Sequence, residues 1–131
     1  DYQQLLIVKR LTEQCGFPVA IVGCPVEREA HGLAMSSRNE RLSPDVRKKA
    51  SFIYETLLAA REKFRTEKAA AVKSWVAHRF KDNPGFDLEY VEIADAETLK
   101  PLEAKAADRK YRIFIAGYAE GVRLIDNIAL D

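Results

Sequence analysis

The sequence predicts an α+β fold in which a helix hairpin packs on a small three-stranded antiparallel sheet. Between Ser43 and Asn83, apolar residues recur at steps of three and four, which predicts two consecutive helices. After Gly85 the pattern becomes extended, with three strand-like stretches of which the last two are joined by a tight turn. A helix and a short apolar run come before these elements and are typical of half of an α/β crossover unit. We therefore expect a boundary near residues 40–43, with a segment 1–41 before it and a domain 42–131 after it.

The amino-terminal element is predicted to be a helix over residues 2–15. Its apolar residues follow helical spacing, and Gly16 is suited to the C-cap. The apolar run Pro18–Cys24 then predicts a buried strand of a parallel sheet, which Pro25 ends. The chain begins inside this helical pattern and without a methionine, so we expect it to be a piece of a longer protein.

A long amphipathic helix is predicted to start at Ser43–Asp45. Serine caps a helix, proline suits its first position, and aspartate interacts favourably with the positive end of the helix dipole. The apolar spacing continues to Phe64, Thr66 is expected to cap a second helix, and Asn83–Gly85 ends that helix. Because the connection is very short, the two helices should form a hairpin.

The extended part of the chain is predicted to form three strands. Phe86–Ala94 changes its apolar parity midway, which predicts a bulge or burial on both faces. Tyr111–Tyr118 is apolar on both faces and is therefore expected to be the central strand. Gly121 opens a tight turn before Val122–Ile128, so these last two strands should pair as an antiparallel hairpin.

Composition favours an ordinary globular domain, and 131 residues suffice for one with a sizeable core. A net charge of +1 gives no reason to expect a nucleic-acid or membrane partner. The sequence shows no signal-peptide pattern and no apolar run that could span a bilayer. Cys15 and Cys24 lie among apolar residues and are expected to be buried, reduced thiols, which favours a cytoplasmic location.

Neither the histidines nor the basic stretches predict a site. His31 and His78 are separated and lack the ligand spacing of a zinc site, so no metal ligands are assigned. His31 adjoins a polar loop and is expected to be solvated, whereas His78 is expected to be a surface or half-buried residue of the second helix. The basic stretches 47–49 and 61–65 are interspersed with glutamates, which is typical of a solvated helix face with i,i+4 pairs. These glutamates are Glu55, Glu62 and Glu67.

The strongest candidate site lies in Gly32–Asn39, where Ser36, Ser37 and Arg38 follow an apolar run. Hydroxyls and backbone N–H groups donate to phosphate oxygens, and a guanidinium binds them through a planar fork. The cluster therefore predicts a polyphosphate site, although turn and cap chemistry uses the same residue types. Gln3 and Gln4, in the first helical turn, could bind an anionic ligand that also carries a hydroxyl group.

Four segments carry a resemblance to a known family: Asp1–Leu5, Ile21–Pro25, Gly32–Asn39 and Arg123–Asn127. In this order and spacing they resemble the carboxyl-terminal half of the pantothenate synthetase (pantoate–β-alanine ligase) family. The resemblance implies a nucleotidyltransferase-like protein. Segment 1–41 would be the carboxyl-terminal remnant of its Rossmann-like domain, with the phosphate-binding loop, and 42–131 would be an α+β lid. The family uses ATP and Mg²⁺ to join pantoate to β-alanine through pantoyl adenylate, a step of pantothenate biosynthesis in the coenzyme A pathway.

The resemblance also implies roles for individual residues. Those expected to contact ATP are Asp1, Glu27, Met35, Ser36, Ser37 and Arg38. Among these, Ser36, Ser37 and Arg38 would be catalytic, because they would neutralise charge on the departing pyrophosphate. Gln4 would bind pantoate. Glu27 stands where relatives usually carry an apolar residue, which leaves a backbone contact with adenine possible but removes an apolar wall against the base.

The resemblance implies small-molecule substrates only, namely pantoate, β-alanine and ATP, with no nucleic acid and no membrane. The full-length protein would be a cytoplasmic homodimer. The family's paired histidines and the lysine that precedes Asp1 lie outside this sequence, so we expect the chain alone to be inactive. Without neighbouring strands, Val19–Val22 should be disordered or paired with another copy. The alternatives are another adenylate-forming nucleotidyltransferase-like enzyme, and a non-catalytic anion-binding module that uses the basic helices.

Overall fold

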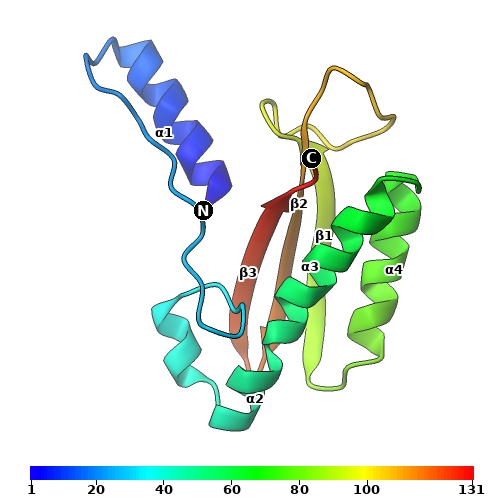
Figure 1. The fold of residues 1–131 in the computed structure, drawn as a ribbon. Coiled ribbons are helices and arrows are strands. Elements are labelled where there is room, and N and C mark those ends of the chain that lie inside the picture. The colour runs from blue at the N-terminus through cyan, green and yellow to red at the C-terminus, as the bar shows by residue number, and fades with distance from the viewer.

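A three-stranded antiparallel sheet forms the centre of the molecule in the computed structural model, which describes all 131 residues (Figure 1). Strand β1 spans Phe86–Asp95, β2 spans Tyr111–Ala119 and β3 spans Val122–Ala129. The strand order is β1-β2-β3, so the predicted central strand is confirmed. Glu89 has no partner in the register between Leu88 and Tyr90, and this bulge accounts for the parity change in the sequence.

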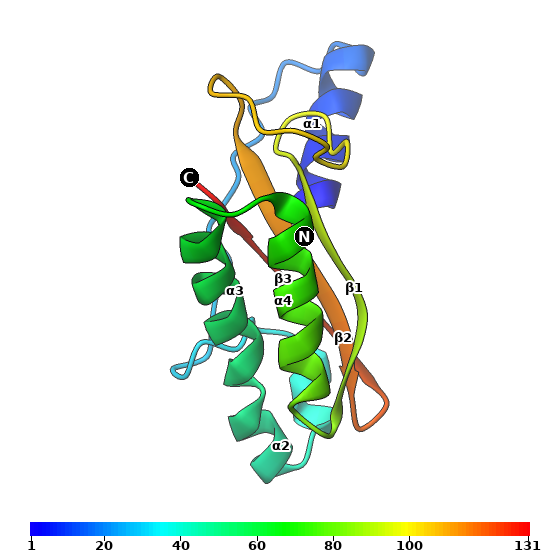
Figure 2. The ribbon, with the colours of Figure 1, turned by 90° about the vertical axis from the view of Figure 1, so that its right-hand side faces the viewer.

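Two long helices cover one face of this sheet (Figure 2). Helix α3 spans Ser51–Phe64 and α4 spans Ala69–Lys81, with α4 packed on β1 and α3 on β3. Their apolar stripes and the facing strand residues form a single core cluster, which buries Leu57, Val72 and Ile113 completely. The predicted α+β fold, a helix hairpin on a small antiparallel sheet, is therefore confirmed.

The helix predicted to run unbroken from Ser43 is in fact two helices. Helix α2 spans Pro44–Lys49 and is capped by the Ser43 side chain, as expected. At Ala50 the N–H donates to the carbonyls of both Val46 (2.9 Å) and Arg47 (3.3 Å), and the chain bends there before α3. Ala50 is fully buried, so the bend between the two helices packs against the core.

Thr66 does not cap the next helix, contrary to the prediction. Its N–H donates to the carbonyl of Lys63, as does that of Glu67, so residues 65–67 continue the last turn of α3. Helix α4 begins later, after Lys68, and has no side-chain cap. The hairpin itself and its end before Pro84 follow the sequence prediction.

The amino-terminal helix lies apart from the core. Helix α1 spans Tyr2–Cys15, with Asp1 as its N-cap and Gly16 in the left-handed conformation (φ 65°) as its C-cap, and it buries no residue. Tyr2 connects it to the sheet, because its hydroxyl donates to the carbonyl of Ala96 (2.5 Å) and its ring lies 6.1 Å from that of Phe114. No helix in the chain is both long and apolar enough to cross a membrane.

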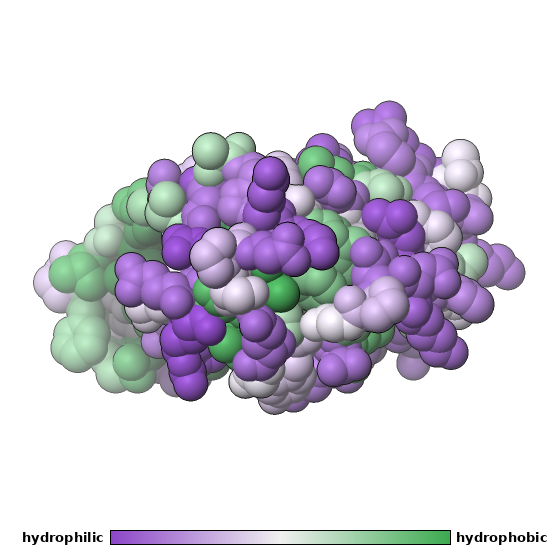
Figure 3. Space-filling view, turned by 90° about the horizontal axis from the view of Figure 1, so that it is seen from below, coloured by the Kyte–Doolittle hydropathy of each residue, from purple (hydrophilic) through white to green (hydrophobic).

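Residues 18–24 do not form the predicted strand. The segment has no ladder partner, and the only sheet of the chain consists of β1, β2 and β3. Cys24 in this segment and Cys15 at the end of α1 are exposed free thiols, so the prediction that they are buried is wrong. Exposed apolar side chains gather on α1 and this segment, which lie at the left in Figure 1, and the left side of Figure 3 is accordingly hydrophobic.

The polar loop between this segment and α2 packs on the main core. Arg28 and Ala34 form an isolated antiparallel bridge, and Leu33 is buried in the same cluster as the helices and sheet. A 3-10 helix, η1, spans Ser37–Arg41 and lies against β3. The residues that precede α2 are thus held by the α+β part of the chain.

Candidate functional site

A groove of about 390 Å³ lies beside β3 and brings together part of the predicted site. From the predicted nucleotide set, the groove is lined by Asp1, Met35, Ser36 and Arg38. Its other polar side chains come from η1 and β3: Asn39, Arg123, Asp126 and Asn127. Residues far apart in the sequence therefore meet at one edge of the sheet.

Three predicted residues do not line this groove. Ser37 begins η1 next to it, and Gln4 lies exposed in the first turn of α1. Glu27 is connected to the groove only through its backbone, because its carbonyl accepts a hydrogen bond from the N–H of the lining residue Met35 at 2.9 Å. This bond places the backbones of two residues that are expected to contact ATP side by side.

Ser36 and Arg38 combine cap chemistry with an exposed cation. The backbone of Ser36 is extended, and its Oγ accepts from the Arg38 N–H at 3.1 Å, which caps η1. The Ser36 hydroxyl proton stays available to donate to an incoming oxygen. The guanidinium of Arg38 is exposed at the groove and has no carboxylate partner in the chain. The turn and cap interpretation is therefore correct for Ser36, and it leaves the Ser36 hydroxyl proton and the Arg38 guanidinium free to bind a ligand.

Asp126 is a residue of this region that sequence reasoning missed. It lies within β3, inside the strand predicted over Val122–Ile128, and its side chain is 3% exposed. Both of its oxygens accept from Arg28, at 2.6 and 2.9 Å. Alternation along the strand places Asp126 in line with buried apolar residues such as Leu124, and a charge at such a position signals a buried partner.

Arg28 is fixed by more than its carboxylate partner. Its Nη1 also donates to the carbonyl of Gly32 at 3.0 Å, and its guanidinium carbon lies 3.8 Å from the centroid of the Tyr54 ring. Gly32 itself has a φ of 106°, which favours glycine. The turn that leads into Met35 is therefore tied to both β3 and α3.

Glu29 provides a second attachment for the loop. It accepts from Arg47 Nε (2.9 Å) and Nη2 (3.1 Å), and from Asn39 Nδ2 (2.6 Å). These hydrogen bonds, that from Arg47 foremost, hold the pKa of Glu29 below its ordinary value, and the pKa of Arg47 is raised by the same bond. Arg47 was predicted to be part of a solvated basic face. Instead, its side chain crosses from α2 to the loop.

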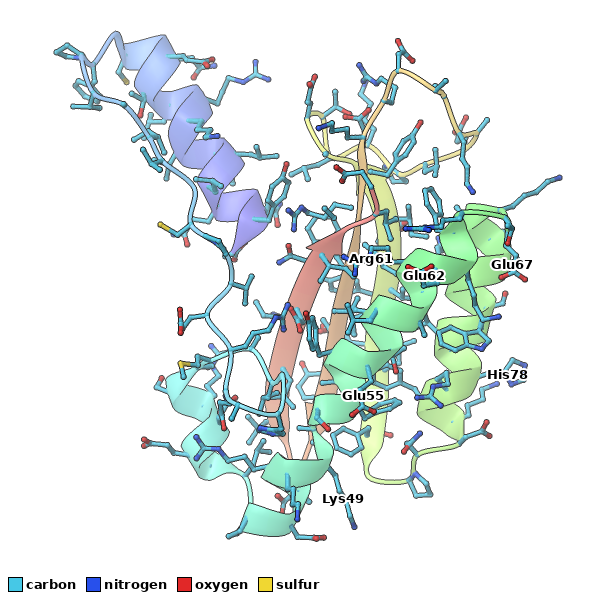
Figure 4. The ribbon with its side chains drawn as sticks, in the orientation of Figure 1. Lys49, Glu55, Arg61, Glu62, Glu67 and His78 are labelled. Atoms are coloured by element: carbon cyan, nitrogen blue, oxygen red, sulfur yellow. The ribbon has the colours of Figure 1, made fainter.

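The two histidines lie apart and outside the groove. His31 Nε2 is 2.9 Å from the carbonyl oxygen of Arg47, so its ring faces α2. His78 is exposed on α4, as predicted (Figure 4). The chain contains no group of three or more His, Cys, Asp or Glu side chains that could hold a metal ion.

The rest of the basic stretch behaves as a solvated face (Figure 4). Its ion pairs are exposed and local: Lys49–Asp45 at 3.0 Å, Lys63–Glu67 at 3.7 Å and Arg65–Glu62 at 3.6 Å. Such pairs stabilise little individually. These three cations are thus matched by nearby carboxylates, whereas Lys48 and Arg61 form no ion pair.

Comparison with known proteins gives one consistent result. The family model for pantoate-beta-alanine ligase matches residues 1–129. A curated pantothenate synthetase from Christiangramia forsetii is 56% identical over 131 residues, which are all of this chain and 46% of that protein. A pantothenate synthetase from Flavobacterium psychrophilum is 48% identical over 99% of the chain and 46% of its own length. The chain thus spans about half the length of these relatives.

Solved structures support the same relationship. The pantothenate synthetase of Thermus thermophilus has a TM-score of 0.88 at 43% identity, and the match covers 99% of this chain and 47% of that one. A pantoate-beta-alanine ligase of Francisella tularensis, complexed with beta-gamma ATP and beta-alanine, has a TM-score of 0.54 at 26% identity. The second match covers 99% of this chain and 41% of that protein.

Proposed function

The chain belongs to the pantoate–β-alanine ligase family, and from this we propose that it supplies the phosphate-binding loop and the α+β lid of an enzyme that condenses pantoate with β-alanine using ATP. The observation that carries the proposal is the groove beside β3, where Asp1, Met35, Ser36 and Arg38 meet. In this proposal segment 1–41 completes a Rossmann-like nucleotide domain, and 42–131 is the lid.

The reaction has two displacements. A carboxylate oxygen of pantoate attacks the α-phosphorus of ATP, the bond to pyrophosphate breaks, and pantoyl adenylate forms. The amine of β-alanine then attacks the acyl carbon, AMP leaves with the electrons of the acyl–oxygen bond, and the amine loses a proton. Pantothenate is the product.

In the first displacement, negative charge builds up on the departing pyrophosphate. Arg38 would bind its oxygens with a guanidinium that no carboxylate of the chain neutralises, and the Ser36 and Ser37 hydroxyls would donate to them. Such contacts accelerate the reaction to the extent that they strengthen as the charge develops. Met35 and Asp1 would line the nucleotide site, with the backbone of Glu27 near adenine, and Gln4 would bind the hydroxyl and carboxylate of pantoate.

Mg²⁺ would accompany the ATP. Magnesium prefers oxygen ligands and is often held by substrate phosphates together with one or two carboxylates. The side chains of this chain do not fit as a cage for it, because no three metal-ligating groups cluster. The ion would therefore be held by the triphosphate and not by a cage of protein side chains. The remaining proposals are that the complete protein is a cytoplasmic homodimer and that its partners are these small molecules, without nucleic acid or membrane.

An assay of AMP formation by the complete gene product tests this function. AMP should appear only when ATP, pantoate and β-alanine are all present, and the 131-residue chain alone should form none. Arg38→Ala should lower kcat/KM for ATP by about 100-fold or more, the usual effect of removing one charge-stabilising donor. Arg65→Ala, an exposed helix residue, is the control and should leave the rate unchanged.

Two outcomes would overturn the proposal. Equal rates for Arg38→Ala and Arg65→Ala would remove the phosphate role of Arg38. AMP formation with other acids but not with pantoate would favour a different adenylate-forming enzyme on the same fold.

A further inference from the structure

We propose that Arg28 and Asp126 are positioning residues for the transfer from ATP: their ion pair sets the place of the Met35–Arg38 loop against the groove. Neither residue needs to touch the substrate. The inference rests on the proposed function, because it concerns how that loop meets the triphosphate.

The pair joins two parts of the site that are 98 positions apart in the sequence. Asp126 lines the groove from β3, and Arg28 lies at the start of the loop that returns to the groove at Met35. The side chains are 16% and 3% exposed for Arg28 and Asp126, respectively, so water screens their interaction only weakly. Two parallel N–H···O bonds, at 2.6 and 2.9 Å, fix the angle as well as the distance between the partners.

The loop transmits this position over a short, hydrogen-bonded path. Gly32 donates to the carbonyl of Glu29 at 2.9 Å, its own carbonyl accepts from Arg28, and the Glu29 N–H donates to the carbonyl of Leu33 at 2.8 Å. The returning strand of this small hairpin ends at Met35, immediately before Ser36 and Arg38. A shift of Arg28 therefore displaces the phosphate-binding groups with it.

A purely stabilising role explains this arrangement less well. A buried ion pair is often no more stabilising than a pair of apolar residues of similar volume. The ion pair also fixes the orientation of the loop, because the Arg28 guanidinium contacts a carboxylate, a carbonyl and an aromatic face at once. Displacing catalytic groups by about 1 Å can slow a reaction by about 100-fold. The orientation of the loop therefore affects the rate more than the ion pair affects the stability of the fold.

The test separates position from stability by replacing both partners. In the complete gene product, the double variant Arg28→Met/Asp126→Leu should unfold at nearly the wild-type temperature, because no unpaired charge is left buried. Its kcat for AMP formation should nevertheless fall by about 100-fold, while KM for ATP changes by less than about threefold. The matched control is Lys73→Met/Glu92→Leu, which removes a half-exposed pair of 3.1 Å outside the groove and should keep wild-type kinetics.

A third variant covers the case in which the double variant fails to fold. Arg28→Lys keeps the charge but cannot reproduce the fork, so its kcat should fall while KM for ATP stays near the wild-type value. A folded double variant, or a folded Arg28→Lys, with wild-type kcat would overturn the inference. A wild-type enzyme that forms no AMP would instead contradict the proposed function, so the two failures are distinguishable.

Discussion

Gly32 shows how strictly the loop is built. Its φ of 106° is a conformation that residues with a Cβ rarely adopt, and a Cβ added there would lie 2.6 Å from Cδ2 of Tyr54. Tyr54 cannot easily move away, because the guanidinium of Arg28 lies against its ring. Both the backbone and the packing therefore require glycine at this position.

We expect Gly32→Ala to lower the free energy of unfolding of the 131-residue chain by about 2–3 kcal/mol, from backbone strain and from the displaced ring. Gly121→Ala is the matched control, since Gly121 has a φ of 74° with no atom within 4 Å of the added Cβ. It should cost only about 1–2 kcal/mol. Urea unfolding measures both values, and an equal loss in the two variants would show that the contact with Tyr54 does not matter.

Glu29 makes stability depend on pH. Its pKa in the folded chain is lowered, chiefly by the hydrogen bond from Arg47, whereas in the unfolded chain it returns to its ordinary value of 4.5. The unfolded state therefore binds more protons as the solution is acidified. The stabilisation is fully present above pH 4.5 and is lost as the pH falls through the folded-state pKa.

Glu29→Gln should accordingly be less stable than the wild type at pH 7, and the difference should shrink as the pH falls below the ordinary pKa of 4.5. Chemical unfolding at a series of pH values measures this. Glu55→Gln, at an exposed position on α3, provides the baseline. A difference that stays constant down to about pH 3 would contradict the assigned role of the Arg47 hydrogen bond.

Among the helices, α3 carries the core and α1 does not. Leu57 of α3 is completely buried, whereas Leu11 of α1 is 52% exposed. In the 131-residue chain, Leu57→Ala should therefore cost about 3 kcal/mol of unfolding free energy, while Leu11→Ala should change it by less than about 0.5 kcal/mol. Thermal or urea unfolding distinguishes these values. A comparable loss for both would mean that α1 packs on the core in solution.

Elements whose pattern depends on local chemistry could be predicted. The periodicity of apolar residues and the capping residues predicted α1 and the hairpin of α3 and α4. Apolar alternation and turn residues predicted all three strands, and the change of parity in the first strand corresponds to the bulge at Glu89. The run 18–24 has the composition of a strand, but a strand also needs a partner strand to satisfy its backbone groups. Residue types do not reveal whether this chain supplies that partner. The bend at Ala50 was equally hidden, because an alanine fits both a continuous helix and a tight turn.

The candidate site could be predicted only where its residues are neighbours in the sequence. Ser36 and Arg38 stand almost side by side in the sequence, and the structure places both at one groove. Asp126 contacts Arg28 from 98 positions away, through a register that only the folded sheet establishes. Arg47 was misread for the same reason, since its partner Glu29 lies on another element.

In the molecule as a whole, the groove joins the end of the loop, the residue that caps α1 and the edge strand of the sheet. The α+β part holds the loop that carries Ser36 and Arg38 through Arg28 and Glu29, while α1 and residues 18–24 present apolar surface away from it (Figures 1 and 3). A nucleotide bound at the groove would therefore touch both the loop and β3. The proposed lid and the proposed phosphate site would then move together.

A crystal structure of the complete gene product with a non-hydrolysable ATP analogue examines this arrangement at atomic level. We expect triphosphate oxygens within hydrogen-bonding distance, about 2.7–3.2 Å, of the Ser36 and Ser37 hydroxyls and the Arg38 guanidinium. The Arg28–Asp126 pair should be intact beneath the loop. A triphosphate bound elsewhere, with these three side chains left in solvent, would contradict the proposed phosphate site.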